Sequence, residues 1–187
     1  LFVFLGFSAL AQTFTGSGGA IPADGTPAYF SLHTSSLGAS VCNSGFGVTR
    51  VCFTLNHPNA ADVEVSLVSP DGTSVILTAG NGGSGNNYSN TCFSDKAEVS
   101  VVQGVAPFSG QFKPVQSLGT LNNGQTGYGE WSLLVRDLNP WADNGMFVNW
   151  SLTFEADATA PLAFYSSDLP IIILDTDGQT IPDDPKI

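Results

Sequence analysis

The chain is poor in charge, and above all in positive charge. Only 11 % of its 187 residues are charged, and five lysines and arginines stand against sixteen aspartates and glutamates, which gives a formal net charge of −11. Nucleic acid and anionic membrane surfaces would be repelled by such a protein, so neither is expected as a partner. Divalent cations would be attracted to it, as they would to any acidic protein.

Residues and motifs that support catalysis are equally scarce. The chain has two histidines, His33 and His57, and it contains no Gly-x-Ser-x-Gly, His-Glu-x-x-His or Cys-x-x-Cys segment. A serine hydrolase or a zinc site is therefore not indicated. The glycine-rich stretch 82–87 lacks the lysine and the following helix of a phosphate-binding loop, and the run 175–178 starts like a calcium loop without the distal glutamate. We expect His57 to be structural and the chain not to be an enzyme.

Helical periodicity longer than two turns is also missing, whereas the alternation typical of strands recurs. Apolar and polar residues alternate over Val51–Leu55 and again over Val63–Leu67. Pro70-Asp71-Gly72 has the proline and glycine of a tight turn and is followed by Val75–Leu77, so a hairpin is expected. Further strands are predicted at Ala97–Val102, Trp131–Arg136 and Met146–Phe154. Together with 42 % hydrophobic residues, this pattern predicts an all-β sandwich or barrel.

The first eleven residues resemble the end of a secretory signal peptide. They form an apolar run that closes on Ala9-Leu10-Ala11, a small-x-small pattern, so cleavage is expected before Gln12. The run is too short to span a bilayer, and a buried strand is the alternative. Export predicts a secreted protein, extracellular or on the cell surface, in which disulfides are permitted.

Composition suggests how the remainder is divided. Residues 12–28 form a lead-in, 29–156 the sandwich domain, and 157–166 a linker. Residues 167–187 add a single apolar strand, and one strand cannot make a core. This tail is therefore expected to be the start of a further, truncated domain.

Three cysteines leave at least one without a partner in the chain. A Cys52–Cys92 bridge would clamp the glycine-rich loop to the sheet, close about forty residues, and contribute about 3–4 kcal/mol. A Cys42–Cys52 bridge across a local turn is the alternative. We favour Cys52–Cys92.

Side chains with oxygen atoms gather in two places and predict a structural Ca²⁺. The first set is Asp62, Asn87 and Asp95, provided that the glycine-rich loop folds back over the strand that Asp62 opens. The second set lies between two strong strands and consists of Asp137, Asn139, Asp143 and Asn144. Calcium prefers several oxygen ligands held on loops. The alternative is that these residues cap their own turns.

Two aromatic residues in loops, Trp141 and Tyr128, could stack against a sugar ring. They therefore indicate a possible glycan or matrix ligand. For Trp141 the alternative is a partly buried residue that anchors its loop.

A series of landmarks follows in one order between Gly45 and Phe154. They are His57 near the end of its strand, Asp62–Leu67, Ser69–Thr73, Gly82–Asn87, Phe93–Asp95, Phe108–Pro114, Gly129–Asp137 and Asp143–Phe154. This series resembles the P domain, or Homo B domain, of kexin- and furin-like proprotein convertases. The resemblance implies a jelly-roll β-sandwich of eight or nine strands, galactose-binding-like, that stabilises or regulates a neighbouring protease. In secreted microbial proteins such domains also occur beside other catalytic domains, and some members bind calcium.

The tail is similar to the opening of secreted CotH-type proteins, which are related to spore-coat kinases. The residues that carry this similarity are 167–176, 178–182 and 185–187. They imply a CotH-like neighbouring domain in the same polypeptide, without any phosphate-handling residues of a kinase in this chain.

The main functional hypothesis is a non-catalytic accessory sandwich that stabilises, positions or targets a larger secreted protein. Because the signal-like segment lies directly before the module, no subtilase domain is expected in front of it. The first alternative is a regulatory domain of a subtilisin-like serine endopeptidase system that acts in proteolysis. The second is a carbohydrate- or matrix-binding module.

Overall fold

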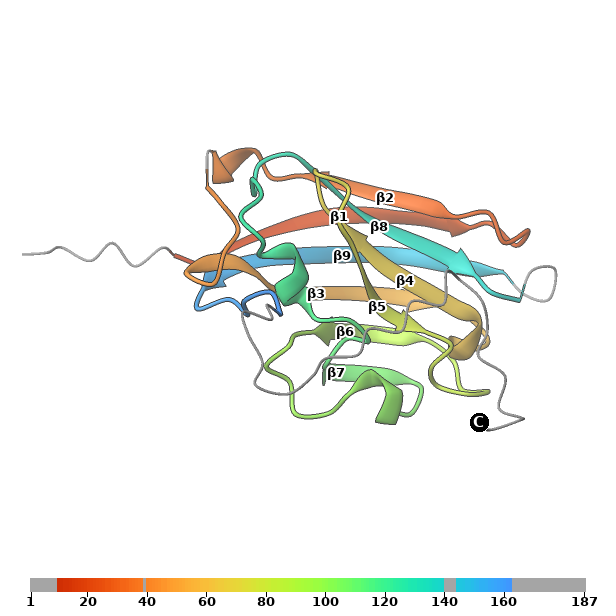
Figure 1. The fold of residues 1–187 in the computed structure, drawn as a ribbon. Coiled ribbons are helices and arrows are strands. Elements are labelled where there is room, and N and C mark those ends of the chain that lie inside the picture. Colours follow the sequence, from red (N-terminus) through yellow and green to blue (C-terminus); the bar gives the residue numbers. More distant parts are fainter. Residues whose placement is uncertain (1–9, 39, 140–143, 163–187) are drawn as a thin grey trace, which may run out of the picture.

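The computed structural model describes residues 10–38, 40–139 and 144–162, and these form a β-sandwich (Figure 1). The strands of this part are β1 (Gln12–Ile21), β2 (Ala28–His33), β3 (Phe46–Asn56), β4 (Val63–Val68), β5 (Ser74–Ala79), β6 (Tyr88–Phe93), β7 (Phe108–Phe112), β8 (Glu130–Asp137) and β9 (Gly145–Ala156). Its helical elements are short 3-10 turns: η1 (Ser35–Leu37), η2 (Ala60–Asp62), η3 (Val101–Gln103) and η4 (Leu118–Leu121). The predicted all-β class, with eight or nine strands, is confirmed.

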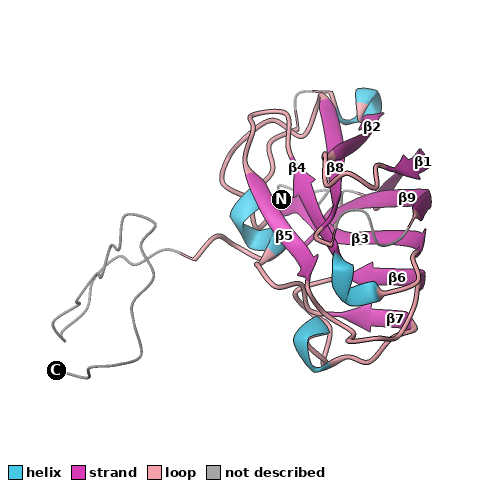
Figure 2. Ribbon diagram, turned by 90° about the vertical axis from the view of Figure 1, so that its right-hand side faces the viewer, coloured by secondary structure: helices cyan, strands magenta, loops and turns pink. Residues whose placement is uncertain are grey.

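The strands form two sheets that pack face to face. One sheet has the order β1-β9-β3-β6-β7 and the other the order β2-β8-β4-β5, and Figure 2 shows both stacks side by side. Neighbouring strands run antiparallel except for β6 and β7. The expected hairpin around Pro70-Asp71-Gly72 is confirmed, since β4 pairs with β5.

The core lies between the two sheets and follows the predicted alternation. The inward residues of β3 and β4 are buried: Val51, Phe53, Leu55, Val63, Val65 and Leu67. Two tryptophans, Trp131 and Trp150, are the largest buried side chains, and Trp131 meets Phe154 edge to face at 5.5 Å between ring centroids. Because large aromatic side chains bury the most apolar surface, these residues contribute much of the stability.

Strand β1 lies within residues 12–28, which the sequence presents as a lead-in to the sandwich. It forms an edge of the five-stranded sheet and pairs with β9 over Gln12–Ile21. Gly16 leaves the space that the Trp150 indole fills, since a Cβ at Gly16 would lie 2.2 Å from Trp150 Nε1. The small residues of this stretch hide its strand character in the sequence, because they lack the apolar alternation of β3 and β4.

The predicted strand Ala97–Val102 is wrong. This segment forms a turn, an isolated bridge between Ser100 and Lys113, and the start of η3. Ala97 and Val101 are buried and Val99 and Val102 are exposed, so the buried positions lie four residues apart. A strand would bury every second residue.

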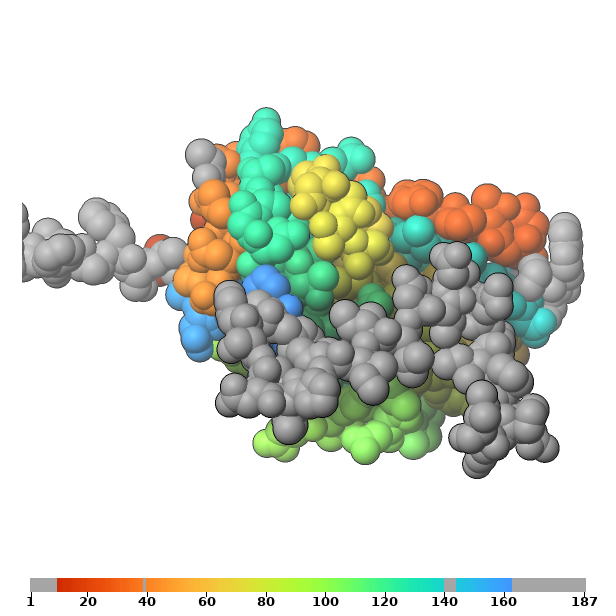
Figure 3. Space-filling view, in the orientation of Figure 1, coloured from red at the N-terminus to blue at the C-terminus, as the bar shows by residue number. Residues whose placement is uncertain are grey.

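The turn between β4 and β5 packs on the loop that precedes β8. In Figure 3 the yellow turn lies beside this teal loop. Gly129 in the loop has φ of 136°, and a Cβ there would lie 2.9 Å from Pro70 Cβ. Glycine is needed at this position both for the positive φ and for the close approach.

The bridge between Cys52 and Cys92 is formed, as predicted. The two residues lie directly opposite each other on β3 and β6, and Cys42 is a free, buried cysteine. The disulfide therefore joins two neighbouring strands of the five-stranded sheet.

Several predictions fall on residues outside the described part. These are most of the signal-like segment 1–11, the end of the linker 157–166, the CotH-like tail 167–187, and the side chains of Asp143 and Trp141. Within residues 10–38, 40–139 and 144–162, no helix has the length and apolar character needed to cross a membrane.

Candidate functional site: a polar cluster around His57

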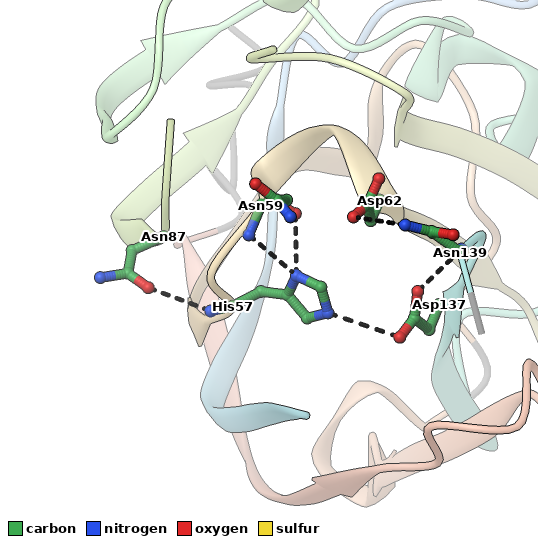
Figure 4. A network of polar contacts seen from close by, with 6 residues as sticks. All are labelled: His57, Asn59, Asp62, Asn87, Asp137 and Asn139. Atoms are coloured by element: carbon green, nitrogen blue, oxygen red, sulfur yellow. Dashed lines mark hydrogen bonds and ion pairs between the residues drawn. The ribbon is translucent and has the colours of Figure 1, made fainter. Parts of the chain in front are cut away.

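A buried histidine and a buried aspartate link the two sheets at one end of the sandwich. His57 follows the last residue of β3, and Asp137 is the last residue of β8. Nε2 of His57 lies 3.6 Å from Oδ2 of Asp137, and the two side chains are 0 % and 1 % exposed (Figure 4). A pair of this kind holds the ends of β3 and β8 together, because removing either partner leaves the other buried and uncompensated.

The other ring nitrogen of His57 contacts the backbone of Asn59. Nδ1 lies 2.8 Å from the carbonyl oxygen of Asn59 and 3.3 Å from its backbone nitrogen. Because a carbonyl oxygen only accepts, the shorter contact requires a hydrogen on Nδ1. A neutral ring would then direct the lone pair of Nε2 at the Asp137 carboxylate, whereas a doubly protonated ring directs a hydrogen there. Nε2 and the Asp137 carboxylate form an ion pair when the ring is protonated.

Asparagine residues and backbone groups complete the cluster. Asn87 Oδ1 accepts from the backbone N–H of His57 at 3.0 Å, and Asp137 Oδ1 accepts from the backbone N–H of Asn139 at 2.9 Å. The Asn139 side-chain amide donates to Asp62 Oδ2 at 3.4 Å (Figure 4). The cluster is therefore a network that joins the loop after β3, the loop before β6 and the end of β8.

A shallow pocket of about 570 Å³ opens beside His57. Its lining combines asparagine side chains with His57, Gly145 and Met146. A Cβ at Gly145 would lie 2.6 Å from Cδ2 of His57, so the backbone of β9 covers one edge of the imidazole. His57 thus borders the pocket, but its side chain is buried.

The contacts of His57 are those of a structural side chain that joins the ends of two strands. We call His57, Asp137 and their hydrogen-bond partners the His57 clamp. Both ring nitrogens of His57 face protein groups, one a carbonyl and the other a carboxylate. A general base needs a nitrogen within hydrogen-bond reach of a nucleophile, and the network in Figure 4 contains no hydroxyl or thiol group. The structural role predicted for His57 agrees with these contacts.

The structure separates two members of the first calcium set. Asn87 precedes β6 and Asp95 follows it, and a six-residue strand is roughly 20 Å long. Asp95 instead fixes η4: its carboxylate accepts from Ser117 Oγ and from the backbone N–H groups of Leu118 and Gly119, at 2.9 to 3.0 Å. Asn87 and Asp95 therefore cannot share one ion, and Asp95 caps η4, which is distant in the chain, instead of its own turn as the alternative expected.

The other predicted ligands lie nearer to one another. Asp62, Asp137 and Asn139 are part of the network around His57, and Asp143 lies outside the described residues. Among the residues that the structure describes, no group of three or more His, Cys, Asp or Glu side chains is placed to hold a metal. Calcium binding at the five predicted residues, Asp62, Asn87, Asp95, Asp137 and Asp143, stays a prediction.

Sequence reasoning missed a second polar anchor, Asn122. This side chain is buried; its Oδ1 accepts from Val48 N at 2.8 Å, and its amide donates to the carbonyl oxygens of Val48 (3.1 Å) and Thr159 (2.8 Å). It thereby ties the start of β3 to the segment after β9. The only signal in the sequence is an asparagine pair at 122–123, which reads as an ordinary turn.

The two aromatic candidates have different outcomes. Tyr128 is 48 % exposed, and its ring meets His33 edge to face at 5.0 Å between ring centroids. Trp141 lies outside the described residues. The stacking role of both residues stays a prediction.

Comparison with known proteins agrees with this fold. The family model of the proprotein convertase P-domain matches residues 47–154, more than half of the chain. Two similar solved structures contain the serine protease of Aeromonas sobria, one in complex with the chaperone ORF2 (19 % identity, TM-score 0.47) and one of the protease (18 % identity, TM-score 0.44). These alignments cover 81 % and 79 % of this chain but only 27 % of each of those chains. No curated protein matches the chain in sequence.

Proposed function

Because this chain belongs to the proprotein convertase P-domain family, we propose that it stabilises, positions or targets a larger secreted protein as its partner. It is a non-catalytic accessory β-sandwich. The observation that carries the proposal is the family match, which extends from β3 to β9 and includes the His57 clamp. A scaffold with closed polar contacts suits a rigid support for another domain.

The partner that the family favours is a subtilisin-like serine protease, so proteolysis is the process in which the chain would take part. The other proposed partner is a CotH-like domain in the same polypeptide, and the proposal rests on the similarity of the tail, residues 167–187, to such proteins. Secretion is supported by the Cys52–Cys92 disulfide, because such bonds persist in oxidising compartments.

A surface for the partner is available around η3. Val102 is 65 % and Val105 79 % exposed, and Val99 is exposed on the same segment. Neighbouring apolar side chains on a polar surface commonly mark a contact with another protein. We expect the partner domain to cover this segment.

The test compares the full polypeptide that contains this chain with a form that lacks residues 12–156. The neighbouring domain should melt at a lower temperature, and lose activity faster on heating, when the P domain is missing. The double change Val102→Ser and Val105→Ser should reproduce part of this loss, whereas Val41→Ser, an exposed valine elsewhere, should not. Equal melting and inactivation of the full and shortened forms would refute the accessory role.

Carbohydrate or matrix binding through Tyr128 is the second candidate function, favoured by the exposure of its ring. On this candidate, Tyr128→Ala should abolish the binding of those glycans that stack on its ring. A glycan array that detects no ligand for the unaltered chain would remove this candidate.

A further inference from the structure

The outer face of the five-stranded sheet carries a depression of about 550 Å³ that none of the functions above uses. It crosses β1, β9, β3 and β6, which Figure 2 shows as neighbours in the stack. Its lining side chains include Thr15, Ser17, Cys52, Asn90, Asn149 and Ser151. All of them are uncharged, in a chain whose net charge is −11.

The register of the strands arranges these residues in two rows. The first row runs from Thr15 through Ser151 to Cys52 and on to its disulfide partner on β6. The second row runs from Ser17 through Asn149 to Thr54. Because neighbouring strands lie about 4.8 Å apart, each row offers a polar group at intervals close to the size of a sugar ring.

The polar groups in the depression have unused hydrogen-bonding capacity. At the edge of the same face, Thr13 and Thr153 are opposite each other and their hydroxyls bond at 3.0 Å. The next two opposite pairs, Thr15 with Ser151 and Ser17 with Asn149, have no side-chain hydrogen bond within the described residues. No other described residue occupies these donors and acceptors, so we take them as available to a ligand.

The backbone at Asn90 departs from regular strand geometry. Asn90 has φ of 47°, in the left-handed region, and the pairing of β6 shifts register between Tyr88 and Thr91. Its backbone N–H donates to Thr54 Oγ1 at 3.2 Å, which places Asn90 at the end of the second row. A bulge of this kind re-aims one side chain, and here that side chain lines the depression.

We propose that this depression binds a neutral oligosaccharide. Amide and hydroxyl groups match the donors and acceptors of sugar hydroxyls, and the disulfide gives a small apolar floor for the C–H face of a ring. A phosphate or another charged ligand has no opposite charge to meet in the lining. Phe53 and Trp150 also border the depression, but their side chains are buried, so an apolar ligand would meet little apolar surface. The site is separate from Tyr128 and independent of the accessory role.

The experiment is a titration of the ¹⁵N-labelled chain with neutral oligosaccharides of glucose, mannose, galactose, xylose and N-acetylglucosamine, followed by NMR. Side-chain amide signals of Asn90 and Asn149 should shift on saturation, and charged oligosaccharides should have weaker effects. Asn149→Ala should weaken binding by about tenfold or more, since it removes a polar group at the centre of the second row. Asn90→Gly, which tolerates the positive φ, should also weaken it.

Two controls make the outcome decisive. The Tm of each variant should stay within about 2 °C of the unaltered chain, because both residues are exposed. Tyr128→Ala should leave the affinity unchanged. The proposal is overturned if no neutral oligosaccharide shifts the Asn90 and Asn149 signals, if both asparagine variants keep full affinity, or if binding depends on Tyr128 instead.

Discussion

The two ends of β3 are both held by Asp and Asn side chains, but in different ways. At the first end, Asp95 and Asn122 each make three hydrogen bonds, mostly with backbone groups. At the second end, His57 Nε2 and Asp137 Oδ2 are buried and face each other at 3.6 Å, with no closer partner in the described residues. The first end is fixed by hydrogen bonds to backbone groups, whereas the second contains a buried histidine–carboxylate contact that is too long for a hydrogen bond. The same residue types therefore hold the two ends of β3 in ways that should respond differently to mutation.

The largest effect is expected when the pair at the second end is broken. Asp137→Ala should lower the free energy of unfolding by about 3–5 kcal/mol, because it leaves the His57 ring buried without its polar partner. Urea denaturation of the purified chain measures this loss.

A double variant is the matched control. Replacing both partners, His57→Leu with Asp137→Leu, should cost less than Asp137→Ala alone, because no buried group is left without its partner. A loss below about 1 kcal/mol for Asp137→Ala would show that the two residues are not a buried ion pair.

A smaller effect is expected at the first end. Asn122→Ala should lower the free energy of unfolding by about 2–3 kcal/mol, because the N–H and C=O of Val48 lose their partner in the interior. Asn123→Ala is the matched control, since this neighbour is exposed and its side chain contacts only the backbone of Gln125 and the carboxylate of Asp71, both outside the interior. Equal losses for the two variants in urea denaturation would contradict the anchor role of Asn122.

Each end also contains one buried weak acid, and these predict a loss of stability in alkali. Burial, together with the charge of Asp71, raises the pKa of the Cys42 thiol from its ordinary value of 9.0 to about 11. Burial raises the pKa of Tyr88 from 10.0 to about 12, against an opposing hydrogen bond with Thr78. A raised pKa in the folded state stabilises the protein fully below the unfolded pKa, and this contribution is lost as pH rises through the folded value.

We therefore expect the free energy of unfolding to fall from about pH 9 to pH 12, by about 1–2 kcal/mol at pH 10. Denaturation at a series of pH values measures the slope. Cys42→Ala should flatten the slope between pH 9 and 11, and Tyr88→Phe the slope between pH 10 and 12. A slope that is unchanged in both variants would place the titrating groups elsewhere.

The contrast between the two ends also shows which structural features can be predicted from the sequence. Val51–Leu55 and Val63–Leu67 are predicted correctly because the strand signal is local and repeats every two residues. The Cys52–Cys92 bridge is predicted because few cysteines leave few pairings. Asn122 is missed because its partners, Val48 and Thr159, are 74 and 37 residues away in the chain. In the sequence, an asparagine in an exposed turn cannot be told from a buried one, because the hydrogen-bond partners of the buried one are distant in the chain.

The same limit applies to calcium, for which the sequence groups Asp95 with Asp62 although Asp95 belongs to the first end. At the second end, the Asp137 carboxylate already accepts from Asn139 and faces His57. The Asp62 carboxylate makes only a long contact with Asn139 among the described residues, so it is the better candidate to bind calcium. We therefore expect any calcium site here to be weak. With a dissociation constant of about 1 mM, about 2 mM calcium adds roughly 0.6 kcal/mol, which corresponds to about 2 °C in Tm.

A thermal melt in calcium and in chelator measures this shift, and Asp62→Asn should remove it. The control variant Asp95→Asn should keep the shift, because its carboxylate serves η4 at the other end. A rise of more than about 5 °C would mean that the loop containing Asp143 completes a strong site, and the second end would then be held by a metal ion in addition to the His57–Asp137 pair.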